Sequence, residues 1–142
     1  MTTAIHKWLT TLCLMAAAGI AVAKPTVVVG GKSFTEQQVI AEMTALVLKN
    51  AGFDVDKRVD MGSSVLRAAQ ENGQVDVYWE YTGTALVIYN KVQERLDRMG
   101  TYERVKSMDE SKGLIWLNPS EANNTYAFAM RKEQAAADNI AT

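Results

Sequence analysis

The segment Thr-Val-Val-Val-Gly-Gly-Lys-Ser-Phe-Thr-Glu, residues 26–36, decides the fold. Its first four residues form a β-branched run, which is typical of a buried strand in a parallel sheet. We expect Gly30-Gly31 to end this strand. Ser33 and Glu36 have the spacing of a capping box, in which each side chain accepts a hydrogen bond from the other residue's main-chain N–H. A helix is therefore predicted to begin here.

The predicted helix carries an apolar stripe. Its members recur with the 3.6-residue period of a helix face that packs on a core, and they are Val39, Ile40, Met43, Leu46 and Val47. Gly52 is expected to stop the helix.

The rest of the chain repeats this order of strand and helix in outline. Such alternation predicts βαβ units and an α/β fold with a parallel sheet. The expected strands are residues 53–60, 75–79, 114–117 and 125–130, and the expected helices are one through 65–69 that stops at Gly73, one from the turn 81–84 toward Met99, one within 101–112, and 132–137.

The composition limits the class of protein. The chain has 142 residues, of which 48% are hydrophobic, with 15 Lys and Arg against 16 Asp and Glu. No basic excess is available to neutralise phosphates, so nucleic acid is excluded as a partner.

Residues 1–23 are predicted to be a cleavable signal peptide. Lys7 precedes a short apolar run, and Ala21-Val22-Ala23 offers a cleavage site. The run is too short to span a membrane, and Cys13 is interpreted as part of it. We expect an exported periplasmic protein that begins at Lys24 and does not insert into the membrane.

Cleavage would remove the chain's one histidine and one cysteine, His6 and Cys13. A mature chain without either residue has no disulfide, no Cys nucleophile, no Ser-His-Asp triad and no zinc site built on His or Cys. The sequence therefore predicts no catalytic residue, metal or cofactor.

Polar turns follow three of the predicted strands. In an open α/β sheet, ligands bind beyond the carboxyl ends of the strands, where helix N-termini favour anionic groups. Donor side chains in these turns are Lys32, Ser33, Ser64 and Thr84. Each turn taken alone is also explained by helix capping.

Several aromatic residues lie near these turns. Tyr81 and Tyr126 are expected either to pack with a satisfied hydroxyl or to face a pocket. Core packing is expected of Trp79 and Trp116, and packing on the first helix of Phe34. For Glu80 we expect a hydrogen bond or a salt bridge.

Three segments, residues 30–37, 75–84 and 123–127, resemble the substrate-binding proteins of osmoprotectant ABC importers, the glycine betaine and choline binders. The resemblance implies a two-lobed periplasmic binding protein of type II. Such a protein closes on a quaternary ammonium ligand and delivers it to a membrane permease and an ATPase. It also implies that residues 24–122 are lobe one and that residues 123–142 are the crossover and the start of a truncated lobe two.

The resemblance also implies the ligand contacts. Lys32 and Thr84 would hold a carboxylate, and Tyr81 and Tyr126 would belong to a cage around the trimethylammonium group. Asn124 would present a main-chain carbonyl. Aromatic faces suit this cation because it has no N–H to donate, and each ring contributes roughly 0.5 to 2 kcal/mol.

Two alternatives remain from the sequence alone. One is an exported interaction module without a small ligand. The other is a hydrolase that uses Ser63 or Ser64, which is disfavoured because no histidine remains to act as its base.

The first prediction concerns export. Protein recovered from the periplasm should begin at Lys24, because the apolar run and Ala21-Val22-Ala23 form a cleavable signal. Intact-mass analysis measures the start of the chain directly. A retained Met1 or a lipid on Cys13 would contradict the prediction.

Overall fold

The computed structural model describes residues 24–140, which divide into two compact units between Tyr78 and Trp79. The predicted signal peptide, residues 1–23, lies outside the described residues. Among the described helices, none has both the length and the apolar character needed to cross a membrane.

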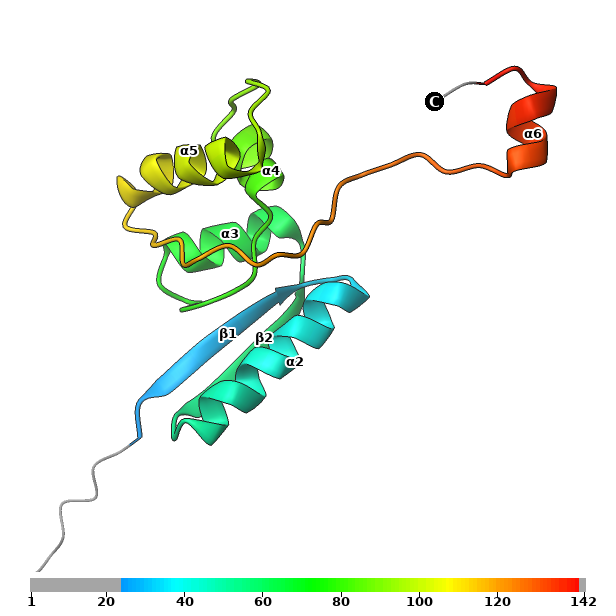
Figure 1. Cartoon of the computed structure of the whole chain (residues 1–142). Helices are drawn as coiled ribbons and strands as arrows, with labels where there is room; N and C mark the ends of the chain where they lie inside the picture. The colour runs from blue at the N-terminus through cyan, green and yellow to red at the C-terminus, as the bar shows by residue number, and fades with distance from the viewer. Residues whose placement is uncertain (1–23, 141–142) are drawn as a thin grey trace, which may run out of the picture. The chain divides into compact units, whose positions relative to one another are not determined.

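The first unit confirms the predicted βαβ arrangement. It contains β1 (Thr26–Lys32), α2 (Thr35–Asn50), β2 (Asp54–Met61) and α3 (Ser63–Glu71). β1 and β2 are parallel, with register from Thr26 opposite Asp54 to Gly30 opposite Arg58. Figure 1 shows α2, which connects the two strands, lying along this sheet.

β1 continues through Gly30-Gly31, so the prediction that these glycines end the strand is wrong. Their role is close packing. A Cβ on Gly30 would lie 2.5 Å from Leu66 Cδ1 and 2.8 Å from Val75 Cγ1. Glycine therefore lets β1 approach the core cluster of Leu66, Ala69 and Val75.

The predicted strand at residues 75–79 is reduced to a single parallel bridge between Val77 and Val29. Gly30 N donates to Val77 O at 2.9 Å, and the main-chain N–H groups of Asp76 and Val77 both donate to Val28 O. The carboxylate of Asp76 accepts from Val28 N at 2.7 Å, so it occupies a donor that a longer ladder would use. The segment thus lies beside β1 without forming a full strand.

α2 begins one residue later than the capping box requires. Its N-cap residue is Phe34, and no side chain caps it, so the predicted capping box is wrong. The helix ends at Asn50, and Gly52 has a φ of +97°, which confirms the predicted stop. Phe34 is 41% exposed, so its predicted packing on the helix is only partial.

The apolar stripe of α2 lies largely on the exposed face of the helix. Val39, Met43, Leu46 and Val47 are 52–68% exposed, whereas the buried residues are Gln37, Ala41 and Ala45. A Cβ on Gly31 would lie 3.2 Å from Ala41 Cβ. Small side chains at four-residue spacing therefore bring α2 close to the sheet, and the stripe has the predicted period but not the expected burial.

An ion pair links α2 to β2 on the surface. Lys57 Nζ donates to the carboxylate of Glu42. This hydrogen bond and the charge of Lys57 lower the pKa of Glu42.

The second unit is helical. It contains α4 (Thr82–Thr84), the π-helix η2 (Ala85–Tyr89), α5 (Arg98–Glu110) and α6 (Lys132–Ala137). A helix continuing toward Met99 is not formed, because Asn90 Nδ2 donates to Ala85 O at 3.0 Å and Lys91 adopts a φ of +59°. The predictions of a helix within residues 101–112 and of the last helix are confirmed.

The core of the second unit surrounds a buried carboxylate. Asp109 is fully buried and accepts hydrogen bonds from Trp116 Nε1 at 2.8 Å, Asn90 Nδ2 at 3.1 Å and Lys112 Nζ at 3.3 Å. Trp116 also meets Tyr102 edge to face, with ring centroids 6.5 Å apart. The core prediction is confirmed for Trp116 and wrong for Trp79, which is 43% exposed.

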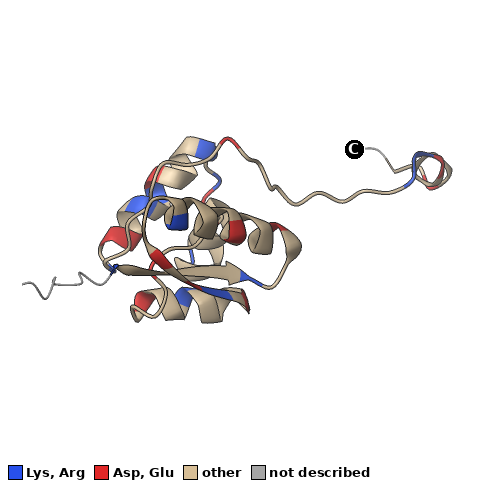
Figure 2. Ribbon diagram, turned by 90° about the horizontal axis from the view of Figure 1, so that it is seen from below, with Lys and Arg blue, Asp and Glu red and all other residues tan. Residues whose placement is uncertain are grey.

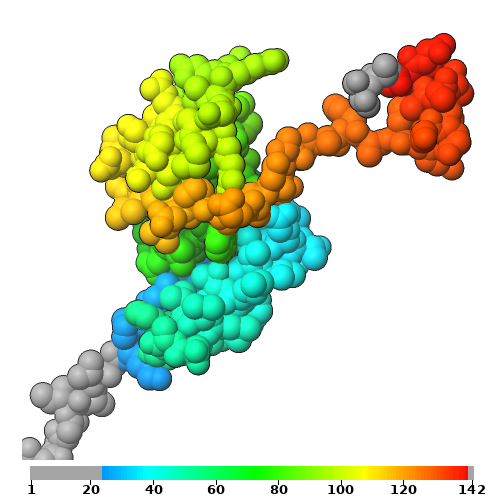
Figure 3. All heavy atoms as spheres, viewed as in Figure 1, coloured from blue at the N-terminus to red at the C-terminus, as the bar shows by residue number. Residues whose placement is uncertain are grey.

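Residues 114–117 and 125–130 are not strands, contrary to prediction. Their apolar side chains alternate, but no neighbouring strand pairs with them in the part of the chain that the structure describes. Ile115 and Leu117 are 85% and 72% exposed. Figure 3 shows much of residues 121–131 as a single file of residues.

Replacing Gly30 tests the close packing of β1. Gly30→Ala should lower the free energy of unfolding by about 1–3 kcal/mol, because the new methyl group overlaps Leu66 and Val75. Gly83→Ala is the control, since a Cβ there also meets nothing within 4 Å. Urea unfolding compares the two variants, and equal stabilities would contradict the packing argument.

The buried carboxylate of Asp109 is tested by comparison with Asp97, the N-cap residue of the same helix, α5. Asp109→Ala should destabilise the chain by about 3 kcal/mol, because it leaves buried donors of Asn90 and Trp116 without their acceptor. Asp97→Ala removes only the N-cap of α5, which accepts from Gly100 N at 2.7 Å, and should cost about 1 kcal/mol. Unfolding followed by far-UV circular dichroism separates them. A smaller loss for Asp109→Ala than for Asp97→Ala would refute the ranking.

Candidate functional site

The carboxyl ends of β1 and β2 bring two predicted ligand turns together. Lys32 is the register partner of Met61, and Ser33 N donates to Met61 O at 3.1 Å. α2 and α3 therefore begin beside each other at one edge of the sheet. The turns at 31–34 and 62–64 are therefore neighbours.

No N-cap residue of the three turns caps its helix with a side chain. The N-cap residues of α2, α3 and α4 are Phe34, Gly62 and Tyr81, and none makes a side-chain cap hydrogen bond. Capping by these residues therefore does not explain the turns. Their partially positive helix ends retain the electrostatic preference for an anion.

Lys32 is the buried cation at this edge. Its side chain is 2% exposed, and its main-chain N–H faces Gln37 Oε1 at 3.4 Å, where Gln37 is itself 1% exposed. A lysine is rarely buried to this extent unless its charge is compensated. The positive charge of Lys32 and the starts of α2 and α3 together favour an anionic group such as a carboxylate.

An irregularity in β2 lies next to Lys32 and was not predicted from the sequence. The register shifts between Gly30 and Lys32, where Asp60 has a φ of +66°. Aspartate is one of the few side chains that tolerate this conformation, and bulges often occur beside ligand sites. The sequence carries no signal for the bulge, because Asp60 reads as an ordinary polar strand residue.

Tyr81 and Thr84 lie together at the start of the second unit's first helix. Tyr81 is the half-buried N-cap residue of α4, and Thr84, also half-buried, is the last residue of α4. Tyr81 N donates to Glu80 Oε1 at 2.8 Å, which confirms a hydrogen-bonding role for Glu80. Both candidate residues therefore lie within one helical turn.

Asn124 and Tyr126 lie in the extended segment between α5 and α6. Both are exposed, and the Tyr126 side chain is 99% exposed, so it is not packed in the core. The structure therefore does not bring Tyr126 into contact with Tyr81 or Thr84. Lys32 belongs to the first unit, and the other four candidates belong to the second.

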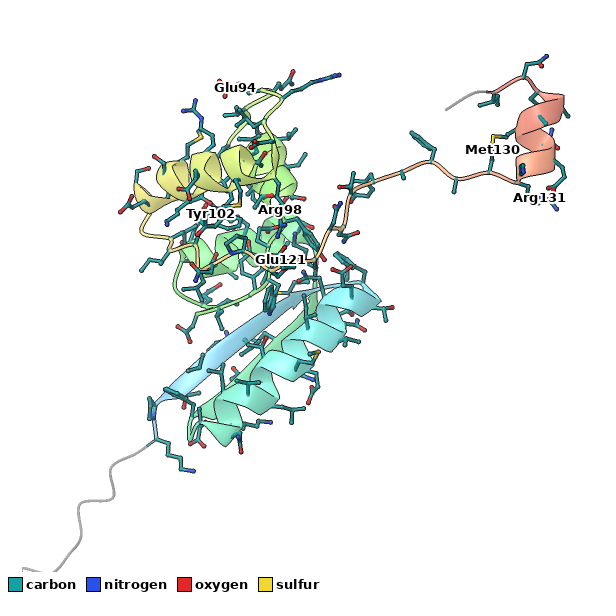
Figure 4. All side chains as sticks on the ribbon, in the orientation of Figure 1. Glu94, Arg98, Tyr102, Glu121, Met130 and Arg131 are labelled. Carbon is teal, nitrogen blue, oxygen red and sulfur yellow. The ribbon has the colours of Figure 1, made fainter. Side chains whose placement is uncertain are left out.

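The chain leading to this segment is attached to α5 at two places. Trp116 is held by Asp109, and Arg98 donates to Glu121 Oε2 at 3.0 Å and to the main-chain oxygen of Ser120. Figure 4 labels Arg98, Tyr102 and Glu121 in this region. Sequence reasoning missed both attachments, since Arg98 and Asp109 lie in a polar stretch with no distinguishing pattern.

Charged side chains are mixed in sign along the chain. Figure 2 shows basic and acidic residues interspersed over the ribbon. Within residues 24–140, no group of three or more His, Cys, Asp or Glu side chains is placed to hold a metal ion.

Comparison with known proteins identifies relatives along most of the chain. The family described as "Substrate binding domain of ABC-type glycine betaine transport system" matches residues 25–142. A glycine-betaine-binding protein of Pseudomonas aeruginosa is 47% identical over 135 residues, covering 92% of this chain and 43% of the relative. The glycine betaine-binding protein YehZ of Escherichia coli is 31% identical over 141 residues, covering 96% and 46%.

A more distant relative and a solved structure also match most of this chain. The ergothioneine transport permease/ergothioneine binding protein EgtU of Helicobacter pylori is 30% identical over 118 residues, covering 81% of this chain and 21% of the relative. The structure of apo YehZ from Escherichia coli matches with a TM-score of 0.68 and 34% identity, covering 82% of this chain and 43% of that one.

The chain thus spans less than half the length of these relatives. The likeness to YehZ confirms the predicted fold class, that of a periplasmic binding protein, over this partial length. The family consists of substrate-binding proteins rather than enzymes, so the hydrolase alternative is wrong. This chain belongs to the family of substrate-binding domains of ABC-type glycine betaine transport systems.

Proposed function

We propose that this chain provides part of the solute-binding site of an ABC importer and that its ligand is a quaternary ammonium osmoprotectant such as glycine betaine or choline. The observation that carries the proposal is the burial of Lys32 at the edge where α2 and α3 begin. The positive charge at this edge suits the carboxylate of a betaine.

Lys32 and Thr84 are the proposed carboxylate ligands. A buried ammonium gives a charge-assisted hydrogen bond to a carboxylate, which is stronger than a bond between neutral groups. The Thr84 hydroxyl adds a neutral donor from α4. For a zwitterionic ligand the Lys32 charge is favourable, whereas choline has no anionic group to pair with it.

Tyr81 and Tyr126 are the proposed aromatic ligands of the trimethylammonium group. Each ring attracts this diffuse cation through its quadrupole, by roughly 0.5 to 2 kcal/mol. The exposed face of Tyr126 leaves its ring available for such contact. Asn124 is proposed to add a main-chain carbonyl, whose partial negative charge also favours a cation.

The names of the relatives support a betaine as the ligand class. Two of them are glycine betaine-binding proteins, and a third binds ergothioneine. Both named molecules combine a trimethylammonium group with a carboxylate. We further propose, as for the family, a periplasmic location and a permease and ATPase as partners. Residues 24–122 as lobe one and 123–142 as the crossover remain predictions.

The carboxylate role is tested in a chimera, because the chain spans less than half of its relatives. Residues 24–142 replace the matching part of the Pseudomonas aeruginosa relative, and binding is measured by calorimetric titration. Lys32→Ala should weaken glycine betaine by roughly ten- to a hundredfold and leave choline unchanged or slightly tighter.

Lys49→Ala is the matched control, since Lys49 is an exposed lysine in the last turn of α2. It should leave both affinities unchanged. An equal loss for choline and glycine betaine in Lys32→Ala would reject the carboxylate role. A chimera that binds no betaine and no choline would favour an interaction module without a small ligand.

The aromatic role is tested in the same chimera. Tyr81→Ala and Tyr126→Ala should weaken both ligands by similar factors, because both ligands contain the trimethylammonium group. Tyr→Phe at either position should cost less, since the aromatic face survives. If neither alanine variant changes either affinity, these tyrosines are not ligands of the cation.

A further inference from the structure

Gln37 is a buried amide next to the proposed carboxylate ligand Lys32. It lies in the first turn of α2, three residues after the N-cap residue Phe34, and is 1% exposed. The four residues between Lys32 and Gln37 are all exposed. The turn that follows β1 therefore has one buried polar residue at each of its two ends.

The Gln37 side chain ties the start of α2 to the end of β1. Lys32 N donates to Gln37 Oε1 at 3.4 Å. A glutamine at the third helical position of a capping box accepts from the N–H of the N-cap residue, which in α2 is Phe34. Here Gln37 reaches the N–H of Lys32, two residues before the N-cap. This bond joins α2 to the last residue of β1.

A second bond holds the same turn to β2. Ser33 N donates to Met61 O at 3.1 Å, so two successive N–H groups of the turn are bonded, one to α2 and one to β2. The start of α2 also lies close to β1, since a Cβ on Gly31 would lie 3.4 Å from Gln37 O. The main chain from which the Lys32 side chain extends is therefore fixed on both sides.

The amide of Gln37 is neutral at a position where a carboxylate would suit the helix equally well. Either Glu or Gln serves at this position of a capping box, and the partial positive charge of a helix start favours an acidic residue. The acidic residue of this turn is instead Glu36, which is exposed. A carboxylate at the buried position 37 would offset the charge of Lys32, since opposite charges interact strongly away from water. Helix stability alone therefore does not explain a glutamine here.

We propose that Gln37 is a positioning residue that makes the site selective for ligands with a carboxylate. Its oxygen fixes the main chain of Lys32, and its neutrality leaves the Lys32 charge for the ligand. This inference rests on the proposed function, because it takes Lys32 as the carboxylate ligand. Selectivity is a difference between two affinities, so the ratio of the Kd values for choline and glycine betaine measures it.

The hydrogen bond is tested first in the full chain, without a ligand. Gln37→Met replaces the amide with an uncharged, unbranched side chain, so the Lys32 N–H should exchange with solvent about three- to tenfold faster in NMR measurements. The Ser33 N–H is the internal control, because its acceptor is Met61 O, and it should change less. Unchanged exchange at Lys32, or an equal increase at both N–H groups, overturns the positioning role.

The effect of charge is tested by calorimetric titration of the chimera described above. Gln37→Glu should weaken glycine betaine about tenfold and leave choline unchanged or slightly tighter, because the added charge offsets that of Lys32. Gln38→Glu is the matched control, since it adds the same charge at the next residue, which is exposed. Solvent screens that charge, so both affinities should stay within about twofold. Equal effects of the two substitutions on glycine betaine overturn the selectivity role.

Gln37→Met in the chimera tests the inference without a new charge, and it decides the question if Gln37→Glu does not fold. It should weaken glycine betaine about three- to tenfold, but have no further effect in a Lys32→Ala background, because Gln37 acts through Lys32. Equal losses in both backgrounds would show a general structural role and overturn the inference.

Lys32→Ala alone separates this inference from the proposed function. If Lys32→Ala weakens glycine betaine selectively and the Gln37 variants do not, the carboxylate role stands and only the role of Gln37 is rejected. If Lys32→Ala weakens both ligands equally or neither of them, the carboxylate role is rejected and the role of Gln37 with it.

Discussion

The close approach of β1 to the elements on both sides of it is the constraint on which the first unit depends. Gly30 faces Leu66 and Val75 at distances that leave no room for a Cβ, and a Cβ on Gly31 would make tight contacts with Val59 and Ala41. Dense packing of this kind stabilises a small core because every contact carries dispersion energy. Lys32, the last residue of β1, follows these two glycines directly.

Lys32 connects the closely packed part of β1 to the sheet edge where α2 and α3 begin. Lys32 follows the two glycines directly, and the residue after it is tied to Met61 by a main-chain hydrogen bond. The starts of α2 and α3 are thereby held close in the chain to the buried residue Lys32. Because these groups are placed by the backbone and the core, the carboxylate proposed as their ligand would meet charges that are already organised, which reduces the cost of binding.

The second unit is organised differently, around a hydrogen-bonded carboxylate instead of close glycine contacts. Asp109 gathers donors from Asn90, Lys112 and Trp116, which come from three separate parts of the chain. This network and Arg98 hold the chain as far as Glu121. Beyond Glu121 the side chains are exposed as far as Gln134. The run of exposed side chains therefore contains Asn124 and Tyr126.

The sequence by itself determined the βαβ order, the helix stop at Gly52, the last helix and the family, because these depend on local patterns and short motifs. Only the tertiary structure decided which face of α2 is buried, since Ala41 and Ala45 allow a closer approach to the sheet than the apolar stripe does. It likewise decided that residues 125–130 are not a strand, because a strand requires a hydrogen-bonding neighbour that periodicity cannot supply. The buried network of Asp109 was also invisible in the sequence, since a carboxylate becomes a core residue only when distant donors surround it.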